Sequence, residues 1–298
     1  MGLRERQFEF VGDTSVSPES VRPRPLPPPE SVAFPFAPVD PATLEAACKG
    51  FSWLARYHRL AVRGLDRIPH GPAIFVGNHN GGLSPIDGLF LIHYYRKLGY
   101  DEPIYTLAHD ILFRIPRIAK VLNSVGILPA SRQTARAVLE AGHKLLVFPG
   151  GDIENLRPFS QRRRVVLGGR QGFARLALRE GVPIIPVVNA GGHETLVVLA
   201  QGRRLAKAIG ADRFARVHSL PLIFALPWGF LFGPMAALPY LPLPAKVTVQ
   251  VGHAIEPKAW EAMDHPDTLA DELYLQVEQT MQYMLSELYS ERLWPVVG

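Results

Sequence analysis

A short apolar run that leads directly into a glycine-rich turn is the feature that most constrains the fold of this chain. Residues 73–76 (Ala-Ile-Phe-Val) are typical of a buried strand, and residues 88–95 begin a pattern typical of a helix. The turn between them, residues 77–87, has the sequence Gly-Asn-His-Asn-Gly-Gly-Leu-Ser-Pro-Ile-Asp. A strand that enters a helix through such a turn is a unit from which α/β domains are built.

The rest of the chain alternates in the same way between apolar runs and helical periodicity. Strands are predicted near residues 58–65, 73–77, 103–107, 144–148 and 184–188, with an edge-like strand at 245–251. Helices are predicted near residues 41–56, 86–97, 109–122, 132–142 and 268–288, the last with one side facing the core. We therefore expect an α/β fold with a mostly parallel central sheet flanked by helices, and functional residues at its strand ends.

Residues 1–40 precede this domain and are rich in proline. Seven prolines fall between residues 23 and 38, where they disfavour helix and favour extended polyproline geometry. We expect a Pro-rich N-terminal extension at 1–40 and an α/β domain at 41–298. The first residues lack the apolar stretch of a signal peptide, and the single cysteine, Cys48, has no partner for an internal disulfide.

The turn after residue 76 carries two residues suited to acid–base chemistry. His79 follows the predicted strand, and a histidine with an unperturbed pKa of about 6.5 can accept the proton of a hydroxyl group. Asp87 stands at the start of the predicted helix, where its carboxylate could hold the other ring nitrogen and fix the tautomer. The chain has ten histidines, and most histidines are surface or core residues, so this pair alone does not name a reaction.

A second apolar strand, at 144–148, runs into a Pro-Gly-Gly turn. The N–H groups of Gly150 and Gly151 could bind a developing oxyanion there, because glycine leaves the backbone open to approach. Arginines lie before and after this turn, and the planar guanidinium group suits a phosphate. Arg132, at a predicted helix start, and Arg170 are the candidates.

Four sequence blocks in this order resemble the lysophospholipid acyltransferase superfamily, the glycerolipid acyltransferases that include lysophosphatidate acyltransferase. The blocks are Asn78-His79 with Asp87, Gly126 with Arg132, Phe148-Pro149-Gly150-Gly151, and Val182-Pro183-Ile184-Ile185-Pro186-Val187. The resemblance extends over about residues 58–257. Each block is weak alone, whereas four blocks in the family's order are specific.

The resemblance implies a reaction and a role for each site residue. His79 is the general base on an acceptor hydroxyl and Asp87 orients it, while the hydroxyl attacks the thioester of acyl-CoA or acyl-carrier protein. The acceptor is a lysophospholipid or glycerolipid, and the reactive thioester requires no metal or cofactor. The expected substrate contacts are Asn78, Arg132, Gly150, Gly151, Glu154 and Arg170.

The chain departs from the family pattern at two positions. Seven residues separate His79 from Asp87 where the family has four, and Gly150 stands where the family has glutamate. Glu154 or Asp152 could supply the missing carboxylate. A Phe-Pro-Gly-Gly version of the block occurs in a branch that includes neutral-lipid, diacylglycerol-type acyltransferases.

These departures leave other functions open. The chain could be a catalytically inactive lipid-binding protein at a membrane surface, or an acyltransferase with a neutral lipid acceptor. A hydrolase that uses the same histidine on water or on Ser84 is a further alternative, although Ser84 lacks a Gly-x-Ser-x-Gly elbow. Release of thiol from acyl-CoA with and without an acceptor distinguishes transfer, hydrolysis and binding.

The chain is basic, with a net charge of +5 and a pI of about 9.4. Such a surplus suits an anionic membrane face or phosphorylated substrates, and the sequence carries no signature of a nucleic-acid module. The run Arg162–Arg164 is either an ordinary surface or a lipid-headgroup contact. We expect a peripheral protein on the cytoplasmic side of a membrane, with no nucleic-acid partner.

Residues 220–243 are uncharged, mostly apolar and numerous enough to span a bilayer. Five prolines interrupt them, and a spanning segment must satisfy its backbone groups internally, so we do not expect a transmembrane helix. The segment then either packs inside the protein along an acyl-chain channel or dips into a membrane interface, which Trp228 and Tyr240 suit.

Overall fold

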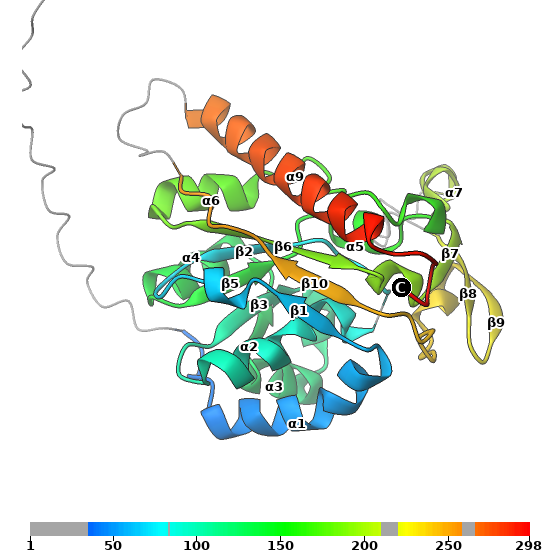
Figure 1. Cartoon of the computed structure of the whole chain (residues 1–298), viewed down its shortest axis with the longest axis horizontal. Coiled ribbons are helices and arrows are strands. Elements are labelled where there is room, and N and C mark those ends of the chain that lie inside the picture. The colour runs from blue at the N-terminus through cyan, green and yellow to red at the C-terminus, as the bar shows by residue number, and fades with distance from the viewer. Residues whose placement is uncertain (1–34, 83, 210–219, 258–265) are drawn as a thin grey trace, which may run out of the picture. The chain divides into compact units, whose positions relative to one another are not determined.

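Seven strands form one central sheet in the computed structural model, which describes residues 35–82, 84–209, 220–257 and 266–298 (Figure 1). In order across the sheet the strands are β1 (Ala61–Arg63), β10 (Thr248–Val251), β6 (Ile184–Ala190), β2 (Ile74–Gly77), β5 (Lys144–Val147), β3 (Ile104–Ala108) and β4 (Ile127–Pro129). Neighbouring strands run parallel except where β10 meets β6. The predicted mostly parallel sheet is therefore confirmed.

Helices flank the sheet, as the alternating pattern predicts. They are α1 (Pro41–Tyr57), α2 (Phe90–Leu98), α3 (Pro116–Ser124), α4 (Arg132–Glu140), α5 (Gly151–Asn155), α6 (Gly172–Glu180), α7 (Arg203–Ala208) and α9 (Pro266–Ser290). In Figure 1, α6 and α9 lie on one side of the sheet and α1 and α2 on the other. α1 begins at Pro41 because the Asp40 side chain caps it, accepting the backbone N–H of Thr43 at 2.9 Å.

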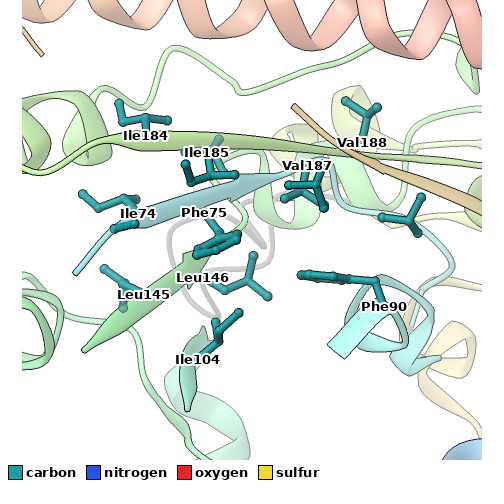
Figure 2. Close-up of a cluster of buried hydrophobic side chains, with 14 of the residues drawn as sticks. Ile74, Phe75, Phe90, Ile104, Leu145, Leu146, Ile184, Ile185, Val187 and Val188 are labelled. Carbon is teal, nitrogen blue, oxygen red and sulfur yellow. The ribbon is translucent and has the colours of Figure 1, made fainter. Parts of the chain in front are cut away.

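The core lies between the sheet and these helices. Because the central strands are covered on both faces, they are apolar along their length and do not alternate. Every residue of β2 and β6 is buried. Figure 2 shows the side chains that pack there, including Ile74 and Phe75 from β2, Leu145 and Leu146 from β5, and Phe90 from α2.

A second, antiparallel sheet of three strands is not among the predicted elements. It consists of β7 (Val197–Ala200), β8 (Leu222–Ala225) and β9 (Gly229–Phe232), in that order. The uncharged segment 220–243 therefore folds as the β8–β9 hairpin and a following 3-10 turn (Gly233–Ala237). No helix within the described ranges is both long enough and apolar enough to cross a membrane.

The two outer strands of the central sheet differ from their predictions. β10 is not an edge strand, because it bonds β1 on one side and β6 on the other. The strand predicted at 58–65 is shorter, since only residues 61–63 pair with β10. α9 buries its apolar side, as predicted. The predicted Pro-rich extension falls mostly on residues 1–34, which lie outside the described residues.

Candidate functional site

The candidate site lies at the carboxyl ends of three adjacent strands, β6, β2 and β5. The sheet order divides at β2, because β3, β4 and β5 lie on one side of it and β1, β6 and β10 on the other. Open α/β sheets bind ligands at such a point, where the loops after neighbouring strands diverge. His79 follows β2 and Gly150 follows β5, so the first and third sequence blocks meet here.

His79 and Asp87 are in direct contact, as predicted. Nδ1 of His79 lies 2.6 Å from Oδ2 of Asp87. The Asp87 carboxylate also accepts the backbone N–H of Asn80 at 2.7 Å, the Asn80 side-chain amide at 3.0 Å and the Asn189 amide at 3.2 Å. These four contacts occupy the acceptor positions of the carboxylate. With Asp87 as the acceptor, Nδ1 of His79 is the donor, and Nε2 is the ring nitrogen that does not contact Asp87.

The His79 ring is held in place and partly open to solvent. Its side chain is 29% exposed, whereas that of Asp87 is 6% exposed. The ring stacks on Phe148 from the turn after β5, with the ring centroids 5.1 Å apart. A group that approaches from solvent therefore meets a base whose orientation is fixed by Asp87 and Phe148 together.

The long spacer returns to His79 through two glycines. Gly81 and Gly82 have φ angles of +73° and +63°, in the left-handed region that glycine enters without steric cost. A 3-10 turn at Pro85–Gly88 follows and carries Asp87 back toward His79. The extra residues therefore widen the turn without breaking the contact.

Glu154 is the carboxylate that binds the backbone of His79. Its Oε2 accepts the His79 N–H at 2.9 Å, and its Oε1 accepts the Val166 N–H at 2.8 Å. A Cβ atom on Gly150 would lie 2.4 Å from Oε2 of Glu154 and 2.2 Å from the carbonyl oxygen of Val166. Glu154 therefore occupies the space that a side chain at position 150 would need.

Two residues predicted as substrate contacts bind the protein's own backbone instead. Glu154 has no exposed surface, and burial raises its pKa to about 7. Asn78 is 1% exposed; its Oδ1 accepts the N–H of Asn189 at 2.7 Å and its Nδ2 donates to the Asn189 carbonyl at 3.1 Å. These buried polar atoms are bonded inside the protein, and a contact of either residue with a substrate stays a prediction.

Arg157 is a buried member of the site that is not among the predicted residues. It is 1% exposed, and burial lowers its pKa below the ordinary arginine value. Nη1 donates to the carbonyl groups of His79 and Glu154, both at 2.8 Å, and Nη2 donates to Oδ1 of Asn80 at 2.8 Å. One guanidinium thus joins the His79 turn to α5. The sequence signals it only by its position three residues after Glu154.

His193 supports Arg157 from the segment after β6. Its Nε2 donates to the Arg157 carbonyl at 2.7 Å, and the side chain is buried. Burial lowers the pKa of His193 to about 3, so the ring is neutral in ordinary buffers. His193 is therefore a structural donor to the network and not a second base.

The first arginine of the run 162–164 faces the protein. Arg162 is 18% exposed and lies 3.6 Å from Glu194, which is buried and also bound by Arg292 at 2.6 Å. Only Arg163 and Arg164 are exposed. The run is therefore not a continuous basic surface for a headgroup.

One backbone N–H of the Pro149-Gly150-Gly151 turn has no hydrogen-bond partner among the described residues. The N–H of Gly151 already donates to the carbonyl of Phe148 at 3.1 Å, whereas the N–H of Gly150 has no partner within the described part of the chain. Arg170 lies against this turn, where it donates to the carbonyl of Pro149 at 3.0 Å and remains 46% exposed. Gly150 is buried, whereas the Arg170 side chain is exposed and also lies 3.4 Å from Oδ1 of Asp152. The roles of both residues in substrate binding stay predictions.

Arg132 is further from His79. It is exposed in the first turn of α4, where the Ser131 side chain caps the helix by accepting the N–H of Thr134 at 2.9 Å. α4 follows β4, which is three strands from β2, or about 14 Å at normal strand spacing. None of the contacts within the described residues brings Arg132 to His79, and its contact with a substrate stays a prediction.

Comparison with known proteins gives a family match for part of the chain. A sequence profile described as Acyltransferase matches residues 59–190. An uncharacterized protein of Mycobacterium tuberculosis (strain ATCC 25618 / H37Rv) is 30% identical over 239 residues, covering 79% of this chain and 63% of that protein. A Mus musculus protein named "DGAT1/2-independent enzyme synthesizing storage lipids" is 31% identical over 154 residues, covering 51% of this chain and 45% of that protein. The chain thus spans less than two thirds of the length of these relatives.

A solved structure has a similar fold. The crystal structure of the 1-acyl-sn-glycerophosphate (LPA) acyltransferase, PlsC, from Thermotoga maritima matches with a TM-score of 0.50 at 17% sequence identity, covering 84% of this chain and 80% of that one. The likeness shows the shared fold, and the profile match includes His79, Asp87, Glu154 and Arg157. Residues 59–190 thus match the Acyltransferase family, and the α/β domain shares its fold with a glycerolipid acyltransferase.

Proposed function

We propose that this protein transfers a fatty acyl group from an acyl thioester to a hydroxyl group of a glycerolipid. The observation that carries the proposal is the 2.6 Å contact between Nδ1 of His79 and Asp87. It fixes the ring through one nitrogen and leaves the other nitrogen as a base, which is what activation of an alcohol requires. The match of residues 59–190 to the Acyltransferase family supports the reaction class.

In the proposed reaction, Nε2 of His79 takes the proton of the acceptor hydroxyl while the hydroxyl oxygen bonds to the thioester carbon. Negative charge gathers on the carbonyl oxygen, and the N–H of Gly150 is the candidate donor to it. The C–S bond then breaks, and the departing thiolate takes the proton from His79. Asp87 stays ionised and stabilises the imidazolium between these steps.

The proposed donor is acyl-CoA or an acyl-carrier protein, both of which carry phosphate. Arg170 beside the glycine turn is exposed and close to Gly151, so it suits a phosphate near the reacting thioester. Arg132 suits a phosphate at the far end of either the donor or an acceptor such as lysophosphatidate. We place the protein peripherally on the cytoplasmic side of a membrane, where the lipid acceptor resides.

A neutral acceptor, such as diacylglycerol, is a second candidate. Animal relatives whose name refers to synthesis of storage lipids are 31% and 33% identical over the matched segments. The catalytically inactive alternative is less well supported, because both departures that motivate it are accommodated. Asp87 still reaches His79, and Glu154 supplies a carboxylate beside Gly150.

Thiol release by the purified protein tests this proposal. Palmitoyl-CoA is offered alone and then with lysophosphatidate, monoacylglycerol, diacylglycerol or an amino-lipid as acceptor. Release that requires one of these acceptors, with the acylated lipid as product, supports transfer and selects the acceptor. Release without an acceptor supports hydrolysis, and the absence of release under every condition contradicts the proposed function.

A further inference from the structure

The second sheet has two apolar faces, and only one of them is covered. Val198, Ile223 and Leu231 pack together on the inner face as a small separate core. On the outer face, Phe224 pairs across the strands with Phe230, with ring centroids 5.4 Å apart. Phe230 is nevertheless 69% exposed. An antiparallel sheet with one covered face normally presents polar residues on the other face, so this arrangement requires an explanation.

The exposed apolar surface continues beyond the strands. We call it the hairpin face and define it by Trp228, Phe230, Phe232, Met235, Leu238 and Leu241, which are 39% to 69% exposed. Its parts are joined, because Nε1 of Trp228 donates to the carbonyl of Pro239 at 2.6 Å and Leu241 donates to the carbonyl of Leu226 at 2.7 Å. Soluble monomers rarely expose a large contiguous apolar patch unless it is an interaction site.

Positive charge accompanies this surface, and the described residues of its own segments include no acidic side chain. Residues 196–209 and 220–245, which form the second sheet, its following turn and α7, contain no Asp or Glu. α7 comes two residues after β7 and exposes Arg203 and Lys207 together with the apolar Leu205 and Ile209. Apolar side chains beside Arg and Lys, without acids, complement the interface of an anionic lipid membrane.

The hairpin segment is also tied to the candidate site. The hydroxyl of Tyr240 donates to the carbonyl of Gly81 and accepts the N–H of Ser84 at 3.3 Å, so it holds the turn between His79 and Asp87. Leu243 donates its N–H to the carbonyl of Thr195 at 2.8 Å. The same segment therefore connects the apolar surface to the turn that carries the base.

We propose that the hairpin face docks on an anionic lipid surface and sets the His79 turn beside it. The inference rests on the proposed function, because a lipid acceptor has to be reached from a membrane. The docking is shallow: β9 is an edge strand, and its unpaired backbone groups would be costly in hydrocarbon. The indole N–H of Trp228 is already bonded, so that ring brings no unsatisfied donor to the interface.

Vesicle sedimentation of the full-length protein tests the docking. The test variant is Phe230→Asp/Phe232→Asp. The matched control is Ile118→Asp/Val121→Asp on α3, whose side chains are 42% and 64% exposed on another apolar surface. We expect wild type and control to bind phosphatidylcholine–phosphatidylglycerol vesicles alike, and the test variant to bind about tenfold or more weakly. High salt should weaken wild-type binding, since part of the attraction is electrostatic.

Several results would overturn the docking proposal. Equal binding by wild type and the hairpin variant would do so, as would loss of binding by the α3 variant alone. A wild-type dimer that the hairpin substitutions dissociate, with no vesicle binding, would make the face a contact between two copies of the chain.

Activity on a short-chain, water-soluble acceptor separates docking from catalysis. We expect the hairpin variant to retain this activity while losing activity on vesicles. Failure of docking with activity intact would leave the proposed function standing. Vesicle binding without activity on any acceptor would instead contradict the proposed function alone.

Discussion

The carboxylate of Glu154 lies 2.9 Å from the backbone nitrogen of His79, in the space that a side chain on residue 150 would occupy. A carboxylate is thus present beside the glycine turn although the third block lacks one at the family's position. It enters from the first turn of α5 and binds the main chain next to the base. The site therefore has its carboxylate on Glu154, and not on residue 150.

Gly150→Ala should lower both stability and activity. The added methyl group would lie 2.2 Å from the carbonyl oxygen of Val166, so the free energy of unfolding should fall by about 1–3 kcal/mol. The matched control is Gly50→Ala in α1, where nothing lies within 4 Å of the added group. The control should be neutral or stabilised by up to ~1 kcal/mol. Urea unfolding measures the stability of the two variants, and equal stabilities would argue against close packing at Gly150.

Arg157→Lys should disconnect the His79 turn from α5. An ammonium group cannot reproduce the fork that contacts His79, Glu154 and Asn80, so buried acceptors lose their donors. We expect a loss of about 2 kcal/mol or more in stability, together with reduced kcat. Arg164→Lys, at an exposed position, is the control and should behave as wild type. A fully active, stable Arg157→Lys protein would show that the network does not position the base.

His193 should make the protein sensitive to acid. Its folded pKa of about 3 is below the ordinary value of about 6.5. The unfolded protein therefore binds a proton that the folded protein does not, so the free energy of unfolding is highest above about pH 6.5 and falls as the pH drops toward 3. The steepest loss is about 1.4 kcal/mol per pH unit from this group. His193→Gln keeps a donor for the Arg157 carbonyl and should flatten the dependence of unfolding free energy on pH. The exposed control, His253→Gln, should not. Identical pH slopes for the two variants would contradict the assignment.

Arg132→Ala should show which of the two substrates has its phosphate at Arg132. If the acceptor phosphate lies at Arg132, the variant raises the KM for the acceptor and leaves the KM for the donor nearly unchanged. If the phosphate of coenzyme A lies there, the pattern reverses. A neutral acceptor allows only the second result. Steady-state kinetics with each substrate varied in turn measures both constants, and no change in either would remove Arg132 from the site.

Local patterns in the sequence predict the parts of the site that depend on neighbouring residues. The apolar run before Gly77 predicts β2, and the Gly81-Gly82 pair predicts a turn wide enough to return Asp87 to His79. The buried strands were also predictable, because a strand covered on both faces is continuously apolar. The helix predicted at 109–122 is divided at Pro116, where Ile115 is extended as a residue before proline should be.

Features that depend on tertiary packing were not predictable. Glu154 and Asn78 have the residue types of ligand contacts, and only the fold shows that backbone groups of Val166 and Asn189 occupy them. In the sequence, Arg157 resembles a surface arginine. Only the structure shows that it is buried against the His79 turn. The outer face of β9 has the composition of a core strand. It is exposed because no element among the described residues covers Phe230.

The most direct test of the proposed chemistry is acceptor-dependent thiol release by the His79→Ala protein. Wild type and variant are compared on palmitoyl-CoA with the preferred lipid acceptor, after thermal unfolding has shown that both are folded to the same extent. We predict a loss of about 10²–10⁴-fold in kcat, because the variant lacks the general base while Asp87 and Arg157 remain in place. Wild-type turnover by a fully folded His79→Ala protein would contradict it.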